Sequence, residues 1–198
     1  MVNVHDAKVS NQRFYYNVYF WLDTYRSEIK GEVLEVGPGK GYAAYILAKE
    51  FPDAAITAID VVDLLDDTLD GFKFQLYDGV TIPFPDNYFE TVVCFLTLHH
   101  AKNQLGLLSE MMRVCRGKVV ILEQTYNDAF GRIELIGRCW LANKRSHQKV
   151  YIEPRHYLSV DRFRQVFENL HLQEVYYERR PNRHYFSDLF ILTGSSGK

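Results

Sequence analysis

The amino-acid sequence predicts an α/β fold, with a mostly parallel sheet of seven strands, helices on both of its faces and a last strand antiparallel to the others. Three observations lead to this prediction. Short runs rich in β-branched residues alternate with helical patterns from residue 31 to about residue 125, as in parallel sheets. A glycine-rich turn joins the first of these runs to the first helical pattern. A loop alone separates the last two runs, which is typical of an antiparallel pair.

The first 30 residues predict a helix. One of its faces is apolar, with residues spaced three and four apart: Phe14, Val18, Trp21, Leu22, Tyr25 and Ile29. A second aromatic set points elsewhere: Tyr15, Tyr16, Tyr19 and Phe20. This second set either packs in the core or covers a pocket, and the pattern favours neither.

The strands and helices of the central part follow in alternation. We expect strands at residues 33–36, 55–59, 73–77, 91–96 and 118–122, and helices at residues 42–51 and 105–115. Between residues 60 and 72 we expect a short acidic helix of one or two turns. The part from residue 31 to residue 125 should bind a cofactor.

The C-terminal part departs from this alternation. Residues 126–158 contain no clear strand, but residues 130–141 have a helical pattern, so we expect a helical cap over the substrate after the fifth strand. A helix at residues 160–170 and strands at 172–177 and 187–192 close the fold over residues 159–193. All 198 residues are expected to form one domain.

Composition excludes several classes of protein. Hydrophobic residues make up 47% and charged residues 24%, the composition of a globular protein. The net charge of -2 gives no reason to expect a nucleic-acid partner. The sequence shows no signal-peptide pattern and no apolar run long enough to span a bilayer. Cys94, Cys115 and Cys139 are widely spaced and odd in number, which suits a reducing compartment, so we expect a cytoplasmic protein.

The glycine-rich turn runs from Glu35 to Gly41 with the sequence Glu-Val-Gly-Pro-Gly-Lys-Gly. A nucleotide-binding P-loop needs Ser or Thr after its lysine, whereas Lys40 is followed by glycine. A dinucleotide-binding turn needs Gly or Ala where this chain has Tyr42. The remaining pattern suits a ligand without a pyrophosphate and favours the sulfonium of S-adenosylmethionine over the dinucleotides.

Two acidic residues stand at the ends of the next strands. Asp60 ends the second strand, about 20 residues after the turn, where a carboxylate can accept hydrogen bonds from ribose hydroxyls. Asp78 and Gly79 end the third strand and offer the acceptor and the donor that an adenine needs. Ligands bind at such strand ends in open α/β sheets.

The chain resembles the class I S-adenosylmethionine-dependent methyltransferases, in the methyltransferase type 11 group that includes the ubiquinone and menaquinone C-methyltransferases. The resemblance is carried by residues 33–41, 82–90, 98–100 and 110–117 and implies a Rossmann-like sheet. It also implies S-adenosyl-L-methionine as cofactor. Three departures are a short second helix, Arg116-Gly117 in place of Pro-Gly-Gly, and Glu90 in place of the usual Asp.

The resemblance also implies which residues bind the cofactor. The methionine half would contact the turn, at Glu35, Gly37, Pro38, Gly39 and Gly41. Asp60, with Val61 beside it, would hold the ribose, and Asp78 with Gly79 the adenine. The backbone near Cys94 and Phe95 would bind the methionine amino group.

Catalytic residues are less defined. His99, His100 and Tyr16 are the candidates, because histidine exchanges a proton near neutral pH and an N-terminal tyrosine, whether Tyr15, Tyr16 or Tyr19, could place an aromatic face on the sulfonium. We expect no metal site, since adjacent histidines on an extended chain point in opposite directions and no carboxylate or cysteine accompanies them at ligand spacing.

The predicted function is the transfer of a methyl group to a small-molecule acceptor by in-line displacement. The cap carries basic residues that would suit an anionic acceptor: Lys144, Arg145, His147, Lys149, Arg155 and His156. One alternative is a regulator or partner subunit that binds the cofactor without catalysis. Another is a nicotinamide-dependent oxidoreductase, which Tyr42 and the lack of a Tyr-x-x-x-Lys pair disfavour.

Overall fold

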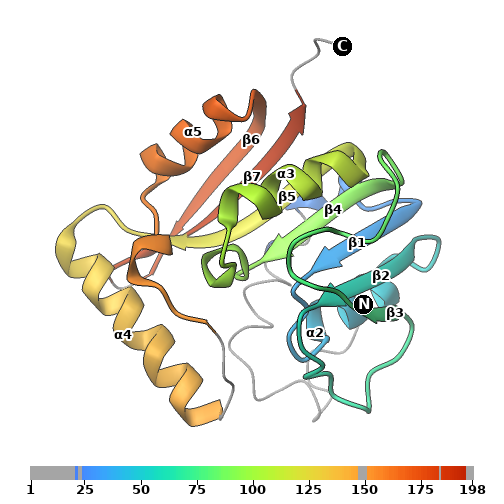
Figure 1. Cartoon of the computed structure of the whole chain (residues 1–198), viewed down its shortest axis with the longest axis horizontal. Helices are drawn as coiled ribbons and strands as arrows, with labels where there is room; N and C mark the ends of the chain where they lie inside the picture. The colour runs from blue at the N-terminus through green and yellow to red at the C-terminus, as the bar shows by residue number, and fades with distance from the viewer. Residues whose placement is uncertain (1–20, 22–23, 147–150, 183, 195–198) are drawn as a thin grey trace.

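A seven-stranded sheet forms the centre of the molecule (Figure 1), in a computed structural model that describes residues 21, 24–146, 151–182 and 184–194. The strands lie in the order β3-β2-β1-β4-β5-β7-β6. Their bounds are β1 (Glu32–Val36), β2 (Ala55–Asp60), β3 (Lys73–Leu76), β4 (Phe89–Phe95), β5 (Cys115–Thr125), β6 (Leu172–Pro181) and β7 (Phe186–Gly194). Only β7 runs against the others, because it pairs antiparallel with both β5 and β6. The predicted fold class is confirmed.

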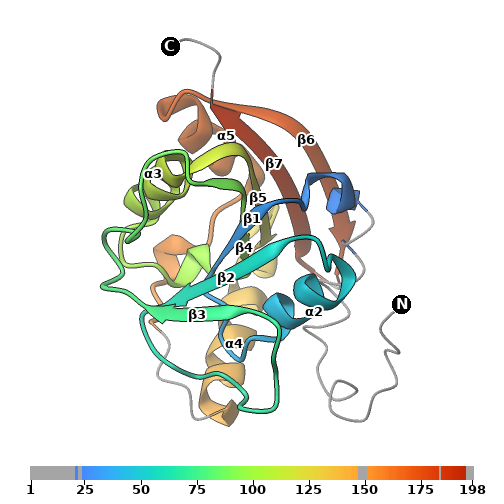
Figure 2. The same ribbon diagram turned by 90° about the vertical axis from the view of Figure 1, so that its right-hand side faces the viewer.

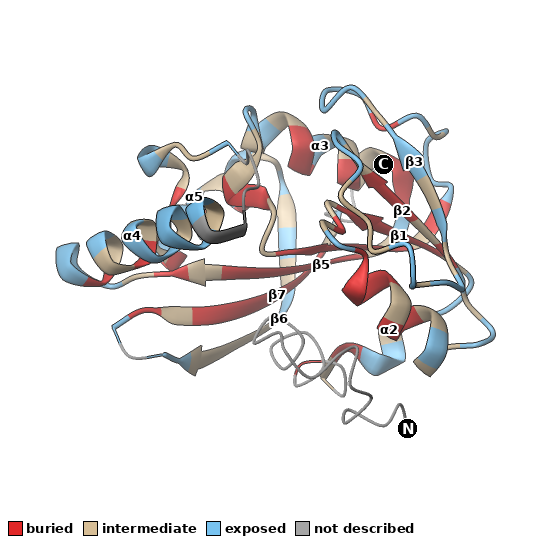
Figure 3. Cartoon of the chain, turned by 90° about the horizontal axis from the view of Figure 1, so that it is seen from below, coloured by how far each residue is buried: buried red, intermediate tan, exposed pale blue. Residues whose placement is uncertain are grey.

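Helices cover both faces of the sheet (Figure 3). They are α2 (Tyr42–Glu50), α3 (Gln104–Val114), α4 (Ala129–Ser146) and α5 (Val160–Asn169), with three short 3-10 helices, η1 (Arg26–Glu28), η2 (Leu98–His100) and η3 (Pro154–His156). One apolar core joins the sheet to α2 and to the segment from Trp21 to Ile29. A second core, on the other face, joins the sheet to α3 and α5. Alternate residues of the central strands serve the two cores, as the pleat of a strand requires.

The N-terminal segment can be compared with the prediction only in part. Trp21, Tyr25 and Ile29 are buried in the first core, as the predicted apolar face requires, and Tyr25 lies 5.6 Å from Phe95, ring centre to ring centre. The second aromatic set and the remaining members of the face, Phe14, Val18 and Leu22, lie outside the described residues.

The connection from β2 to β3 differs from the prediction, because residues 61–72 contain no helix. The Asp63 carboxylate accepts a hydrogen bond from the Leu65 amide at 3.1 Å, and the Asp66 carboxylate accepts one from the Thr68 amide at 3.0 Å. Such local bonds from a side chain to the backbone two residues on compete with helix formation. The acidic residues that suggested a helix therefore form turns. Figure 2 shows this edge of the sheet, with β3 outermost.

Arg113 on α3 fixes the loop that leads into β4. Its guanidinium donates to the carbonyls of Ile82 and Phe84, at 2.8 and 2.9 Å, and also reaches the carboxylates of Asp86 and Glu110. Glu110 in turn accepts the Ile82 amide at 2.9 Å. Two stretches that carried the resemblance, residues 82–90 and 110–117, thus form one interlocked unit.

Helix α4, in the segment expected to form the cap, packs through a third, smaller cluster built around Leu135, Tyr157 and Tyr185. In the part of the chain that the structure describes, no helix is both long enough and apolar enough to cross a membrane.

Candidate active site

The glycine turn leaves β1 through three left-handed glycines. Gly37, Gly39 and Gly41 have φ angles of +74°, +56° and +83°, a region that residues with a Cβ rarely adopt. The Gly37 amide donates to the Ile59 carbonyl at 2.9 Å, and the Gly41 amide donates to the Pro38 carbonyl at 2.9 Å. The turn is therefore anchored to the end of β2 and delivers the chain directly into α2.

The space around each glycine shows whether the protein's own packing requires it or a ligand can approach it. A Cβ on Gly37 would collide with the side chain of Thr97, and one on Gly41 would meet Leu65 and Phe72. A Cβ on Gly39 would meet nothing within 4 Å. Gly37 and Gly41 are therefore required by the protein's own packing, whereas the bare backbone of Gly39 faces open space that a ligand can approach.

Glu35 is an unusual buried acid. Its side chain is 1% exposed, and within the described residues its Oε2 atom has no hydrogen-bond partner. Burial and the nearby charge of Asp60 raise the pKa of Glu35 to about 8, against a hydrogen bond from the Ala44 amide. A ligand that brings a positive group or a donor to this oxygen would supply the missing partner.

Asp60 ends β2 beside the turn. Its carboxylate accepts the Gly39 amide at 3.3 Å and the Val61 amide at 2.7 Å. Burial raises the pKa of Asp60, and these amide bonds act against the rise. The expected place of Asp60 at the crevice edge is thus observed, together with a second task, since it holds the amide of Gly39.

Asp78 forms a turn at the end of β3. Its Oδ1 atom accepts the amides of Thr81 and Val80, each at 2.8 Å, and these two bonds lower the pKa of the carboxyl group. Gly79 has a φ angle of +76° and lies against Val61, whose side chain is 59% exposed. Asp78 is exposed, and the exposed Val61 side chain near Gly79 is an apolar group that a flat ring can contact.

Cys94 and Phe95 are buried inside β4, and their backbones pair with Ile121 and Leu122 of β5. The chain leaves this ladder at Leu96, a non-glycine residue with a φ angle of +52°. Such a conformation is costly for leucine and is held by the Leu96 amide, which donates to the Leu122 carbonyl at 2.7 Å. The strand therefore ends at Phe95, and the turn at Leu96 directly follows the two residues expected from the sequence to lie near the amino group.

The charge of this crevice, formed by the strand ends around the turn, is negative. Asp60 and Asp78 carry the charge, since Glu35 with its raised pKa is mostly protonated at neutral pH, and Lys40 is exposed. A pyrophosphate would meet carboxylates here, whereas a ligand that carries a sulfonium and an ammonium group would be attracted. The charges therefore agree with the sequence pattern, which favoured S-adenosylmethionine over the dinucleotides.

His99 and His100 lie side by side, which corrects the expectation that they point in opposite directions. They occupy the 3-10 helix η2, where successive side chains are about 120° apart. Their ring centres are 4.0 Å apart. The assumption of an extended chain was wrong because the turn at Leu96 ends the strand before the histidines.

His99 is buried against an acid. Its Nδ1 atom donates to the Glu123 carboxylate at 2.6 Å, and the Glu123 side chain is fully buried on β5. Burial disfavours the imidazolium, but Glu123 outweighs it and raises the pKa of His99 to about 9. A histidine protonated at neutral pH cannot accept a proton, so the site does not favour His99 as a general base.

Cys139 of α4 completes this group. Its Sγ atom lies 3.8 Å from Nε2 of His100, and the ring of Tyr157 lies 4.9 Å from that of His99. Burial alone would raise the pKa of Cys139, but interactions with His100, His99 and Tyr157 lower it. A cysteine therefore does accompany the histidines, although it is 39 residues away in the chain.

Sequence reasoning missed four side chains of the site: Thr97, Glu123, Cys139 and Tyr157. The Thr97 hydroxyl donates to the Gly37 carbonyl at 2.9 Å, and so joins the turn to the segment that carries the histidines. No local sequence motif predicts any of these four residues. The charged residue Glu123 in an otherwise apolar strand was the one signal that could have been read, because a buried acid needs a partner.

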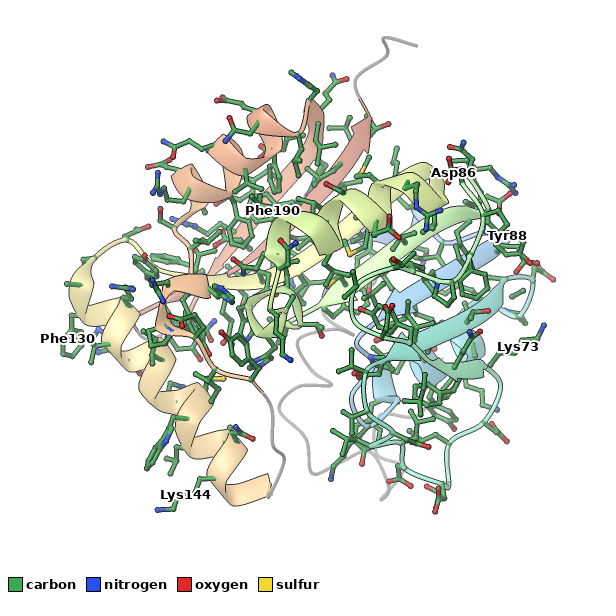
Figure 4. The ribbon with its side chains drawn as sticks, in the orientation of Figure 1. Lys73, Asp86, Tyr88, Phe130, Lys144 and Phe190 are labelled. Carbon is green, nitrogen blue, oxygen red and sulfur yellow. The ribbon has the colours of Figure 1, made fainter. Side chains whose placement is uncertain are left out.

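Of the basic residues expected in the cap, His156 lies near the histidines, because its ring centre is 5.8 Å from that of Tyr151, whose carbonyl accepts a hydrogen bond from His100. Lys144 and Arg155 do not converge on them. Lys144 lies on the side of α4 turned away from the sheet (Figure 4), with its Nζ atom 5.2 Å from the ring centre of Trp140. Arg155 is exposed and pairs with Glu153 at 3.0 Å. The side chain of Arg145, with His147 and Lys149, lies outside the described residues, as does Tyr16.

Comparison with known proteins gives a consistent family. Residues 34–122 match the model of a methyltransferase domain family. A ubiquinone/menaquinone biosynthesis C-methyltransferase of Desulfotalea psychrophila is 29% identical over 103 residues. That alignment spans 48% of this chain and 42% of the relative, so it covers less than half of either protein.

Solved structures share the architecture over nearly the whole chain. A SAM-dependent methyltransferase of Aquifex aeolicus has a TM-score of 0.66 at 16% identity, and the superposition covers 93% of this chain and 95% of the Aquifex chain. The magnesium protoporphyrin IX methyltransferase of Synechocystis, solved with bound SAH, has a TM-score of 0.63 at 15% identity, covering 95% and 85%. The cyclase SpnF has a TM-score of 0.71 at 14% identity, covering 92% and 81%.

The cyclase shows that this fold also serves other reactions, so the fold alone does not establish an activity. The family match rests on the residues that build the crevice, from β1 through the turn to β5. S-adenosylmethionine is the cofactor of that group. Residues 34–122 thus match a methyltransferase domain family, and the glycine turn and the sheet order are similar to those of solved S-adenosylmethionine-dependent methyltransferases.

Proposed function

We propose that the protein transfers a methyl group from S-adenosylmethionine to a small-molecule acceptor by in-line displacement. The observation that carries the proposal is the open backbone of Gly39 between two acids, one of which, Glu35, has a buried oxygen without a partner. A ligand with positive groups and a short backbone-facing portion fits this arrangement.

The residues that would hold the cofactor follow from this placement. Glu35, Gly37, Pro38, Gly39 and Gly41 would face its methionine half. Asp60 and Val61 would meet the ribose, and Asp78 with Gly79 the adenine, for which the exposed Val61 side chain offers an apolar surface. The backbone at the end of β4, after Cys94 and Phe95, would meet the amino group.

S-adenosylmethionine supplies, when bound, a methyl group on a sulfur that is already positive. The protein's part is then to align the acceptor and to exclude water, effects that contribute up to about 7–11 kcal/mol. A general base is needed only for an acceptor that must lose a proton. His99 is engaged by Glu123 through Nδ1, so it is better suited to orient groups than to remove a proton.

The acceptor would sit between the crevice and α4, next to η2. Of the cations that the sequence suggested for the cap, Lys144 is turned outward and Arg155 is exposed, which argues against a strong preference for anions. A small neutral or weakly charged acceptor fits this part of the chain better than the anionic acceptor that the sequence suggested.

The test has two stages. Isothermal titration of the purified protein with S-adenosylhomocysteine and, separately, with NAD should show binding of the first and none of the second. A screen of small molecules with methyl-labelled S-adenosylmethionine should then show label in one acceptor class. Binding of NAD in preference would overturn the proposal, and cofactor binding with no transfer to any acceptor would favour a non-catalytic regulator.

A further inference from the structure

Three side chains that could bind a metal converge beside the crevice. His99 and His100 come from η2 and Cys139 from α4, and their ligand atoms all lie within 4.8 Å of one another. They come from two elements that are far apart in the chain, so the convergence is a property of the fold rather than of a local turn.

Both imidazoles are oriented in the same way. Nδ1 of His99 donates to the Glu123 carboxylate, and Nδ1 of His100 donates to the Tyr151 carbonyl at 2.7 Å. In each ring this leaves Nε2 as the atom available to a ligand. Nε2 of His100 lies 3.8 Å from Sγ of Cys139, and His99 is also within hydrogen-bonding reach of that thiol.

Metal-binding histidines almost always donate their second ring nitrogen to a carboxylate or a backbone carbonyl. His99 has the first kind of partner and His100 the second. Glu123 is fully buried and also accepts the His99 backbone amide at 3.4 Å, so it fixes the ring that it touches. The outer contacts of a metal site are therefore present together with its possible ligands.

A buried hydroxyl beside the cluster has no partner. Tyr157 is 1% exposed, and among the described residues nothing hydrogen-bonds to its oxygen. Its ring packs on His99, and its hydroxyl lies near Cys139. A buried hydroxyl without a partner destabilises the folded state, and a water or other ligand bound at the centre of the cluster would remove that cost.

The spacing suits a tetrahedral ion. With zinc–nitrogen bonds of about 2.0–2.1 Å and zinc–sulfur bonds of about 2.3 Å, neighbouring ligands in a tetrahedron are about 3.6 Å apart. The separation of 3.8 Å between His100 and Cys139 is close to this value. All three ligand atoms lie within 4.8 Å of one another, so binding one ion requires them to approach by about 1 Å at most. Two imidazoles and a thiolate also select zinc over magnesium or calcium, which prefer oxygen.

We propose that His99 Nε2, His100 Nε2 and Cys139 Sγ bind one Zn²⁺ ion and leave a fourth position open. Three protein ligands with an open position are the arrangement of catalytic rather than structural zinc sites. The fourth position takes water or an anionic sulfur, oxygen or nitrogen donor, and the Tyr157 hydroxyl lies where it can hydrogen-bond to that group. Zinc binding displaces two protons to solvent, one from Nε2 of the protonated His99 ring and one from the Cys139 thiol, so the ion is held by neutral imidazoles and a thiolate.

The first experiment measures metal binding to the full chain. Protein freed of metal with a chelator is titrated with Zn²⁺, and in a parallel experiment with Co²⁺, whose tetrahedral complexes absorb visible light and whose thiolate bonds give a charge-transfer band in the near ultraviolet. We expect one ion per chain and both spectral features. A wild-type protein that binds no metal, or binds Co²⁺ without the thiolate band, overturns the proposal.

Variants then test the ligands. Cys139→Ser should abolish the charge-transfer band and weaken Zn²⁺ binding by roughly 100-fold or more, and Glu123→Gln should weaken it by roughly 10- to 100-fold. The matched controls are Cys115→Ser, a buried cysteine at the start of β5, and His171→Asn, an exposed histidine whose left-handed backbone asparagine tolerates. Both controls should bind Zn²⁺ as the wild type does.

The metal site and the proposed transferase activity fail separately. Titration with S-adenosylhomocysteine is carried out on the same samples, so that folding and cofactor binding are known for each variant. Unchanged Zn²⁺ affinity in Cys139→Ser, or an equal loss in Cys115→Ser, contradicts the assigned ligands. Loss of S-adenosylhomocysteine binding in the metal-free wild type would leave the zinc site standing and bear on the cofactor crevice alone.

Discussion

The crevice around the glycine turn and the cluster around the histidines lie at the same edge of the sheet but are built in different ways. The crevice uses main-chain geometry from residues 35–79, with left-handed glycines and amides held by Asp60 and Asp78. The histidine cluster is built mainly from side chains of η2, β5, α4 and the segment before α5, with the Tyr151 carbonyl holding the His100 ring. The first is a binding surface set by backbone shape, and the second is a polar group set by tertiary packing.

This difference has energetic consequences. The crevice tolerates few changes at its glycines, because each position is fixed by its φ angle whatever side chain is introduced. The cluster can change one member at a time, at the cost of leaving the others without partners. Three variants in the crevice and one on α4 test how strictly the crevice is fixed. The cluster is tested by the Cys139 and Glu123 variants described above.

The change with the largest expected effect is Gly39→Val. A valine side chain would occupy the open space at Gly39 and would also strain a left-handed position, so we expect S-adenosylhomocysteine binding to fall below detection in a calorimetric titration. Gly71→Ala provides the control for backbone strain, since Gly71 has a φ angle of +89°. It lies just before the start of β3, at the end of that strand away from the crevice. Each change should lower the free energy of unfolding by roughly 1–2 kcal/mol or somewhat more, but only Gly39→Val should affect binding.

Glu35→Gln tests the buried acid through pH. An acid whose pKa is higher in the folded state stabilises the fold at pH values below its unfolded pKa of 4.5, and that contribution is lost as the pH rises through about 8. Between these values the wild type should lose up to about 1.4 kcal/mol of unfolding free energy per pH unit relative to the variant. Urea denaturation at several pH values measures this slope.

The control for this pH experiment is Glu168→Gln, an exposed position on α5, which should run parallel to the wild type. Parallel curves for the wild type and Glu35→Gln would mean that Glu35 titrates as an ordinary solvated acid. The crevice would then hold no buried protonated carboxyl group.

Asp60→Ala should weaken binding of S-adenosylhomocysteine by about 1–3 kcal/mol, because charge-assisted hydrogen bonds are lost. Part of that loss comes from the broken hydrogen bond between the Gly39 amide and the Asp60 carboxylate. This bond lies within the protein and does not involve the ribose. A 2′-deoxyribose analogue isolates the other part, since its penalty should be large in the wild type and small in the variant. Equal penalties in both proteins would place the ribose elsewhere.

The change with the smallest expected effect is Lys144→Ala, on the cap. The side chain is turned away from the sheet and rests near Trp140, so we expect the free energy of unfolding to change by no more than about 0.5 kcal/mol. The KM for an acceptor found in the transfer screen should stay the same at low and high salt. A rise in KM that is largest at low salt would show that this cation faces the acceptor after all.

The two regions also differ in how far the sequence predicts them. Gly37, Gly39 and Gly41 could be identified because a conformation restricted to glycine leaves a direct mark on the sequence, and alternating apolar runs leave an equally direct mark for the sheet. The turn formed by residues 61–72 was misread as a helix, since Asp63 and Asp66 are compatible with either until their local hydrogen bonds are known.

Nothing comparable marks the histidine cluster. Leucine at a positive φ angle has no sequence signature, yet Leu96 decides that His99 and His100 stand in a 3-10 helix and lie side by side. Cys139 reaches them only because α4 folds back against Tyr157, which is a matter of long-range packing. A prediction from local patterns therefore stops where the site depends on contacts between distant elements.

The contact between Gly37 and Thr97 has a consequence for how related sequences can vary. The methyl and hydroxyl of Thr97 fill the space in which a side chain at position 37 would lie, and the hydroxyl also binds the Gly37 carbonyl. A larger residue at position 37 would thus need a smaller one at position 97 as well as a new backbone angle. Position 37 should stay glycine across evolution, while position 97 should drift only among small residues, with those that keep a hydroxyl most frequent.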